Sequence, residues 1–177
     1  MKQALILPGW YQKPTDNWYP WLKQALEKKG YQAYLPDLLT NHTDSPSLKR
    51  FLTVIGKLIT ITPQTVIIGH SLGCLTAMRL AEKYKYKQMF LIAGWDFNDL
   101  TYEHRLFWKT PLNHKKIQKN VKQIYCITSD NDPYMTAFQV EEMSKRLKAK
   151  FILIKGAGHF GKDDKITRLP SLLKLVT

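Results

Sequence analysis

The segment that most constrains the fold of this chain is residues 69–73, with the sequence GHSLG. The β-branched run at 65–68 predicts a strand before it, and the good helix formers at 74–81 predict a helix after it. A serine at the tip of such a sharp turn has a strained backbone, so its close neighbours must lack side chains, and the two glycines meet that need. The pattern predicts a nucleophile elbow presenting Ser71. The alternative is a glycine-rich turn with an exposed serine.

Strands and helices are predicted to alternate along the whole chain. Strands without polar alternation, separated by helices, are typical of a parallel sheet covered on both faces. We therefore expect a three-layer α/β/α fold with a mostly parallel six-stranded sheet, and one domain over residues 1–177. The expected strands are 4–7, 32–35, 65–69, 89–93, 123–128 and 151–154, and the expected helices are 18–29, 47–60, 72–83, 114–120, 134–147 and 170–175.

The segment 94–108 interrupts this rhythm because it is long for a strand-to-helix connection and unusually aromatic. Long loops in compact domains are usually lids or binding loops. A small cluster of aromatic side chains packed over the helices explains the composition equally well. The sequence leaves both interpretations open.

Composition limits the classes of partner. The net charge of +13 is compatible with an acidic partner, but most lysines fall late in helices or just after them, where cations complement the helix dipole. We therefore expect a solvated basic surface, no specific nucleic-acid partner and, since no apolar run is long enough to cross a bilayer, no membrane insertion. Cys74 and Cys126 fall within predicted core elements, which favours reduced thiols in a cytoplasmic protein.

A serine hydroxyl needs a base to take its proton and an acid to orient that base. The fifth expected strand ends in a stretch that contains Asp132, and the sixth ends in a glycine-rich loop that contains His159. The carboxyl ends of parallel strands meet at one edge of the sheet, so both side chains can approach Ser71. The glycines of the loop are expected to let His159 swing over the serine.

Other residues compete for these roles. Asp130 is the alternative acid, and Asp132 is favoured because Pro133 forces it towards an extended conformation. Asp132 is also a good cap for the helix expected after it. The side chain of His70 is expected to turn away from the serine. The remaining histidines lie in polar stretches with no matching acid: His42, His104 and His114.

Acyl transfer also needs donors for the developing oxyanion. The backbone N–H of Leu72, directly after the serine, is one candidate, and the N–H of Trp10, in the loop after the first strand, is the other. Gly9 would let that loop approach the substrate closely. The expected substrate-binding side chains are Trp10, Trp18, Tyr19 and Trp95, with Trp21 as a further candidate wall. Core packing of the first helix is the alternative explanation for Trp18 and Trp21.

These motifs together resemble the small serine hydrolases related to retinoblastoma-binding protein nine and the bacterial YdeN-like proteins. The resemblance is carried by PG at 8–9, NWYPW at 17–21, GHSLG at 69–73, SDNDP at 129–133 and GAGHF at 156–160. It implies a compact α/β-hydrolase fold without a large cap domain. It also implies Ser71 as nucleophile, Asp132 as triad acid and His159 as base. It supplies no natural substrate.

We expect a serine hydrolase of the carboxylesterase type that cleaves a small ester, thioester or amide through an acyl-enzyme intermediate. The expected partner is a small acyl substrate, with no metal and no organic cofactor. The alternative is a binding module that keeps the hydrolase scaffold and contacts an acidic partner through its basic surface.

Overall fold

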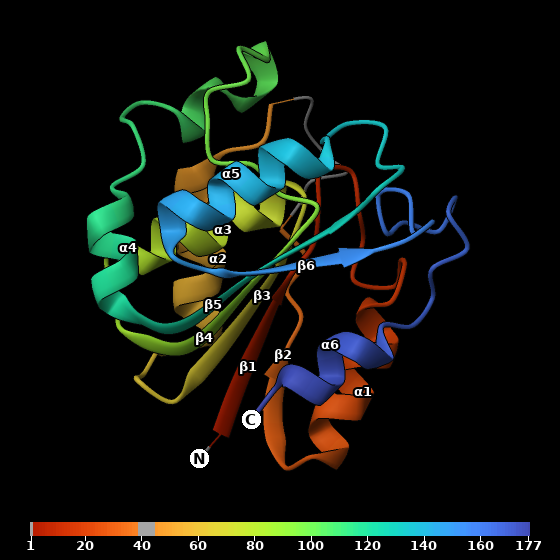
Figure 1. Cartoon of the computed structure of the whole chain (residues 1–177). Helices are drawn as coiled ribbons and strands as arrows, with labels where there is room; N and C mark the ends of the chain where they lie inside the picture. Colours follow the sequence, from red (N-terminus) through yellow and green to blue (C-terminus); the bar gives the residue numbers. More distant parts are fainter. Residues whose placement is uncertain (1, 39–44) are drawn as a thin grey trace.

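The structure is a computed structural model that describes residues 2–38 and 45–177. Its centre is a six-stranded sheet in the order β2-β1-β3-β4-β5-β6, in which every neighbouring pair is parallel (Figure 1). All strands therefore end at the same edge of the sheet. The strands are β1 (Lys2–Leu7), β2 (Tyr31–Tyr34), β3 (Thr65–His70), β4 (Tyr86–Ile92), β5 (Val121–Ser129) and β6 (Lys150–Ile154).

Helices cover both faces of this sheet. One face packs against α2 (Leu48–Leu58), α3 (Leu72–Ala81), α4 (His114–Asn120) and α5 (Ala137–Leu147). The other packs against α1 (Tyr19–Lys28) and α6 (Pro170–Leu175), which lie side by side in Figure 1. Alternate residues of each central strand enter the two cores, because successive side chains point to opposite faces. The expected three-layer fold with a parallel sheet is confirmed.

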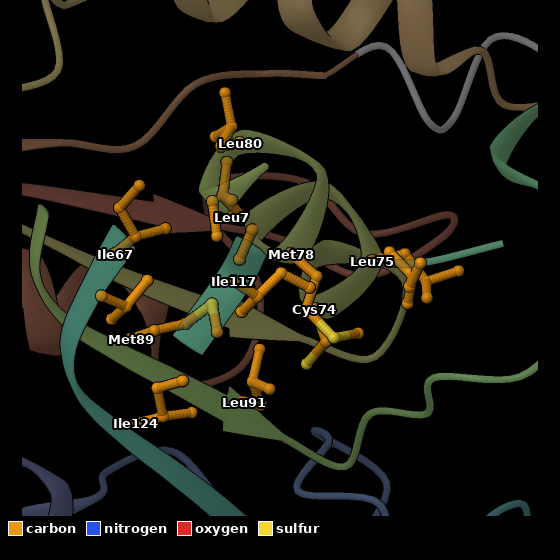
Figure 2. Close-up of a cluster of buried hydrophobic side chains, with 14 of the residues drawn as sticks. Leu7, Ile67, Cys74, Leu75, Met78, Leu80, Met89, Leu91, Ile117 and Ile124 are labelled. Atoms are coloured by element: carbon orange, nitrogen blue, oxygen red, sulfur yellow. The ribbon is translucent and has the colours of Figure 1, made fainter. Parts of the chain in front are cut away.

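The β3–α3 unit that carries the GHSLG turn is the most deeply buried part of the molecule. Every residue of β3 and of α3 is buried. In Figure 2 the side chains of α3 lie over those of β1, β3 and β4. Cys74, at the start of α3, is fully buried, and its Sγ lies 3.2 Å from the carbonyl oxygen of Gly69. Packing of β3 and α3 in the core therefore fixes the position of the turn between them.

Several element bounds differ from the sequence-based expectation; β4, for example, begins at Tyr86 instead of residue 89. Helix α5 begins at Ala137 instead of residue 134, because Thr136 and Gln139 form a capping box that fixes its first turn. The aromatic segment 94–108 contains a short 3-10 helix, η1 (Tyr102–Phe107), that was not predicted. Within the residues that the structure describes, no helix is both long and apolar enough to cross a bilayer.

Candidate active site

Ser71 occupies a backbone conformation that serine rarely adopts. Its φ of 52° and ψ of −120° place it at the tip of the turn between β3 and α3. The flanking glycines are required by close backbone approach. A Cβ at Gly69 would lie 2.6 Å from the carbonyl oxygen of Gly73, and one at Gly73 would lie 2.2 Å from the carbonyl oxygen of Leu7. The spacing of the motif is therefore a packing requirement, as the sequence predicted.

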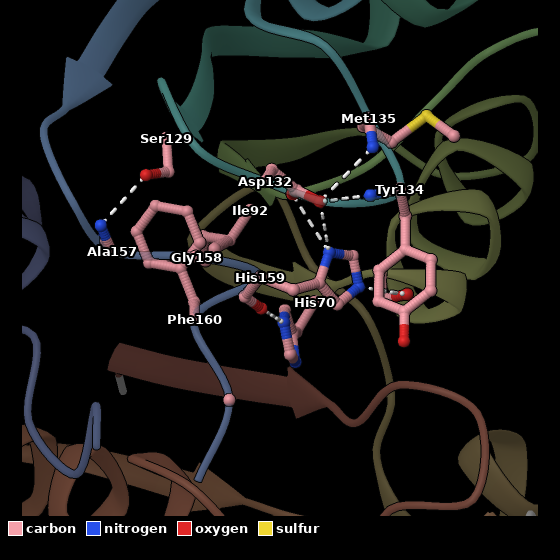
Figure 3. A network of polar contacts seen from close by, with 12 residues as sticks. His70, Ile92, Ser129, Asp132, Tyr134, Met135, Ala157, Gly158, His159 and Phe160 are labelled. Atoms are coloured by element: carbon pink, nitrogen blue, oxygen red, sulfur yellow. Dashed lines mark hydrogen bonds and ion pairs between the residues drawn. The ribbon is translucent and has the colours of Figure 1, made fainter. Parts of the chain in front are cut away.

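Side chains from three strand ends meet at this point, and Figure 3 shows the contact between two of them, His159 and Asp132. The Nε2 atom of His159 lies 3.0 Å from Ser71 Oγ, and its Nδ1 lies 2.9 and 3.0 Å from the two carboxylate oxygens of Asp132. The carboxylate can only accept, so Nδ1–H donates to it and Nε2 is left to accept the serine proton. The Asp132 side chain is completely buried and that of His159 is 16% exposed. This arrangement can perform nucleophilic acyl transfer.

The two candidate acids have separate positions. Asp132 Oδ1 accepts hydrogen bonds from the backbone N–H groups of Tyr134 (2.9 Å) and Met135 (3.1 Å), which hold the carboxylate in place beside His159. These bonds close a turn ahead of α5, so the expectation that Asp132 caps the helix is wrong, and Thr136 is the cap. Asp130 instead accepts from the N–H of Gly156 at 2.7 Å.

The loop that carries His159 is held in place, contrary to the expectation that its glycines leave it free to swing. Five backbone N–H groups of the loop, at residues 156–159 and 161, donate to side chains. Those of residues 156, 157 and 158 donate to Asp130, Ser129 and Asn131, and those of 159 and 161 donate to Asp164. The polar run after β5 therefore pins the loop after β6. The glycines serve its shape, since Gly156 and Gly158 have positive φ.

His70 connects the elbow to the same loop from below, as Figure 3 shows. It is fully buried, and its Nε2 donates to the carbonyl oxygen of His159 at 2.7 Å. Its Nδ1 then carries no proton, and the hydroxyl of Tyr19 lies 2.5 Å from it. Burial, and secondly the nearby imidazole of His159, lower the pKa of His70 from 6.5 to about 3. The neutral imidazole therefore fixes the position of the His159 backbone, a contact that the sequence did not reveal.

The loop after β1 lies directly against the serine, where the second oxyanion donor is expected. A Cβ at Gly9 would come within 3.2 Å of Ser71 Cβ. The N–H of Gly9 donates to the Tyr19 hydroxyl at 3.2 Å, which fixes the loop from below. Leu72 is the first residue of α3, so its N–H belongs to a helix start without an intrahelical acceptor. The two predicted oxyanion donors are the backbone N–H groups of Leu72 and Trp10. Both residues line the pocket above Ser71.

That pocket has a volume of about 530 Å³, which suits a small molecule. Trp10 and Trp95 line it, as expected, but Trp18 and Tyr19 do not. Both of these are fully buried in the core beneath, where the Trp18 indole donates to the Phe160 carbonyl oxygen at 3.1 Å. Their assignment as pocket walls is therefore wrong, because the start of the first helix packs against the sheet and buries both side chains there. The lining residues are Trp10, Tyr11, Gln12, Ser71, Leu72, Trp95, Asp99, Thr101, His104, Tyr134, Met135 and His159.

His104 and His114, for which the sequence offered no matching acid, each contact an aspartate. The Nδ1 of His104 lies 2.7 Å from Asp99 Oδ2 within the pocket wall. His114 Nε2 lies 2.7 Å from the buried Asp96, which also receives a bidentate bond from Arg146. His42 lies outside the described residues. In the described part of the chain, no group of three or more His, Cys, Asp or Glu side chains is arranged to hold a metal ion.

Comparison with known proteins assigns the class. The model of the serine hydrolase family matches residues 4–177, so the chain belongs to that family. Serine hydrolase RBBP9 of Rattus norvegicus is 28% identical over 163 residues, which cover 89% of this chain and 87% of the rat protein.

A bacterial relative matches in both sequence and structure. The YdeN protein of Bacillus subtilis (strain 168) is 26% identical over an alignment 183 residues long. The alignment covers 99% of this chain and 95% of YdeN. The crystal structure of the ydeN gene product superposes with a TM-score of 0.88 at 25% identity, over 99% of this chain and 96% of that one. The expected resemblance to RBBP9 and the YdeN-like proteins and the compact α/β-hydrolase fold are both confirmed.

Proposed function

We propose that this hydrolase cleaves a small carboxylic ester, thioester or amide, with short-chain esters as the default substrate, through a Ser71–His159–Asp132 triad. The observation that carries the proposal is the 3.0 Å separation between His159 Nε2 and Ser71 Oγ, in an imidazole whose other nitrogen is bonded to a buried carboxylate. Nucleophile, base and orienting acid thus form one hydrogen-bonded series.

In the first half of the reaction, Ser71 Oγ attacks the carbonyl carbon while its proton passes to His159 Nε2. The carbonyl π electrons move to oxygen, and the N–H groups of Leu72 and Trp10 bind this oxyanion. Collapse of the tetrahedral intermediate breaks the bond to the leaving group, which takes the proton from His159. Asp132 stays ionised and stabilises the transient imidazolium.

In the second half, a water molecule gives its proton to His159 Nε2 and attacks the acyl carbon of the Ser71 ester. The second tetrahedral intermediate expels Ser71 Oγ, which regains the proton. The products are the free acid and the leaving alcohol, thiol or amine, and every proton is accounted for without a metal or an organic cofactor. Two free, buried cysteines support our proposal of a reducing, cytoplasmic compartment.

A fluorophosphonate probe tests this proposal, because it reacts only with an activated serine. We expect the wild type to be labelled and Ser71→Ala to be unlabelled, with kcat for a model ester lowered by about 10⁶-fold. Ser144→Ala is a matched control, since Ser144 is a buried serine in α5 whose hydroxyl donates to the Glu141 carbonyl oxygen and which does not line the pocket. Failure of the wild type to react, together with salt-sensitive retention on a polyanion, would support the binding-module alternative instead.

A further inference from the structure

A groove lined by lysines lies at the edge of the sheet opposite the catalytic pocket. Its cavity of about 440 Å³ is bounded by α4, the start of β5 and the end of α5. Gln118 Nε2 joins the two helices by donating to the Arg146 carbonyl oxygen at 2.7 Å, and Figure 1 shows α4 beside the end of α5. We call this cavity the lysine groove, and the lysines that line it are Lys115, Lys119, Lys122 and Lys148.

The positive charges of the lysine groove are not balanced by the protein itself. All four lysines are exposed, and no aspartate or glutamate lines the cavity. Within the described residues, none of the four ammonium groups makes a hydrogen bond or an ion pair. The two acids of α5, Glu141 and Glu142, lie 3.8 and 2.8 Å from the Nζ of Lys145. The groove therefore presents four cations in one place.

The helix dipole, which explains most lysines of this chain, does not explain the lysines of α4. Because α4 begins at His114, Lys115 lies in its first turn, where the dipole disfavours a cation. Lys119 follows four residues later on the same face of the helix, and like charges at this spacing destabilise a helix. The expectation that the lysines complement helix ends is therefore wrong for Lys115, and the pair is retained at a cost to the fold.

Lys148 adds a further charge on an unfavourable backbone. It is the C-terminal cap of α5, with a φ of 52° and a ψ of 40°, a left-handed conformation that glycine adopts without strain. Lys145 and Arg146 already supply cations to the last turn of α5. A glycine at 148 would therefore suit the fold better, which indicates that the amine has another use.

The chemistry of the groove selects a compact anion that carries several charges. A lysine ammonium is a point charge with three rotatable donors, and the oxygens of a phosphate, which point in several directions, suit it as acceptors. One carboxylate or one phosphate would leave most of the four cations unbalanced. Phosphates linked in a short chain place charge on every unit, so such a chain can meet all four lysines at once. The volume of the groove is in the range of small-molecule sites.

We propose that the lysine groove is a binding site for a small polyphosphate, the chemistry that inorganic triphosphate and nucleoside triphosphates share. Lys115 and Lys119 approach the phosphate chain from α4, Lys122 from β5 and Lys148 from the end of α5. Ser71 lies at the carboxyl ends of the strands, whereas the groove lies where β5 begins. The site is therefore separate from the catalytic pocket, and the inference does not depend on the proposed hydrolysis.

The test is calorimetric titration of the whole chain with sodium triphosphate, ATP and orthophosphate at low salt. The groove variant is Lys115→Gln with Lys119→Gln. The matched control is Lys28→Gln with Lys57→Gln, which removes the same charge from the last turns of α1 and α2, outside the groove. We expect the affinity for triphosphate to fall about tenfold in the groove variant and to change little in the control.

A further variant separates binding from folding. Lys148→Gly removes the amine and places glycine at the positive φ, so the thermal midpoint should stay equal or rise. The affinity for triphosphate should nevertheless fall about threefold. Weaker binding by a chain that is no less stable cannot arise from misfolding.

The ligands themselves distinguish the outcomes. Weaker binding of orthophosphate than of triphosphate would support a site for linked phosphates, and tighter binding of ATP than of triphosphate would assign it to a nucleotide. No binding of triphosphate by the wild type, or equal losses in groove variant and control, would overturn the inference. A preference for duplex DNA over triphosphate that both double variants weaken alike would also overturn it, in favour of a general basic surface. Binding of triphosphate without fluorophosphonate labelling would support the groove and refute only the proposed hydrolysis.

Discussion

Two histidine–aspartate pairs face the same pocket, and they differ in one contact. His159 pairs with Asp132 through Nδ1, and its Nε2 meets Ser71 Oγ at 3.0 Å. His104 pairs with Asp99 through Nδ1 at 2.7 Å, but its buried Nε2 has no hydrogen-bond partner among the described residues. Both imidazoles line the pocket. The same local pairing thus occurs once beside a nucleophile and once without one.

The comparison shows that a histidine–aspartate pair does not by itself define a base. The loop of His159 is also held in place: side chains at the end of β5 and after it, together with Asp164, bind its backbone, and His70 binds its carbonyl oxygen. His104 instead packs edge-on to Trp10 and beside Trp95, which makes it part of the pocket wall. Position relative to Ser71 decides the chemistry that each pair can perform.

Replacing each carboxylate by its amide is the strongest way to break this comparison. Asp132→Asn should lower kcat for a model ester by about 10⁴-fold, because the amide no longer holds the required tautomer of His159. Asp99→Asn should leave kcat within a small factor and change KM at most. Steady-state kinetics on one ester measures both. Equal losses in the two variants would mean that the pairs act together.

The next prediction concerns the hydrogen bond from His70 to the carbonyl oxygen of His159. His70→Phe removes the donor to the His159 carbonyl oxygen, and a base displaced by about 1 Å should cost roughly 10²-fold in kcat with little change in KM. His70→Gln can present an N–H near the position of Nε2, so it should recover part of that loss. A purely structural role would lower the stability of both variants equally without this split in kcat.

The smallest effect, taken per unit of pH, is a dependence of stability on pH. In the unfolded chain His70 takes up a proton below about pH 6.5, whereas in the folded protein it does so only near pH 3. Acid therefore favours the unfolded state between these values, so the free energy of unfolding should fall with falling pH by up to about 1.4 kcal/mol per unit from this group. His70→Gln should remove that part of the slope, as urea unfolding at several pH values would show. An unchanged slope would contradict the burial of a neutral imidazole.

The sequence was sufficient where the residues themselves dictate geometry. Ser71, Asp132 and His159 follow strands, and parallel strands end at one edge, so their meeting could be expected; their catalytic roles stay predictions. Asp132 was favoured over Asp130 through Pro133 and through the family resemblance, and the structure gives Asp130 a separate bond to the N–H of Gly156.

The pocket was harder to predict, because its walls depend on how each helix is rotated against the sheet. Trp18 precedes α1, Tyr19 begins it, and both side chains are buried in the core, which composition alone does not decide. The Asp99–His104 contact forms through the irregular turn before η1, where no periodic pattern applies. A run of four polar residues ending at Asp132 was, in retrospect, a signal that the β6 loop is tied down.

The buried thiol of Cys74 beneath the elbow has a practical consequence for probing this protein. Burial raises the pKa of Cys74 and of Cys126 far above neutrality, so neither offers a thiolate to an alkylating agent or a mild oxidant while the chain stays folded. Two kinds of covalent reagent therefore report on different states. Phosphorus electrophiles react with the serine hydroxyl of the folded protein, whereas iodoacetamide reacts with the two cysteines only after the chain unfolds.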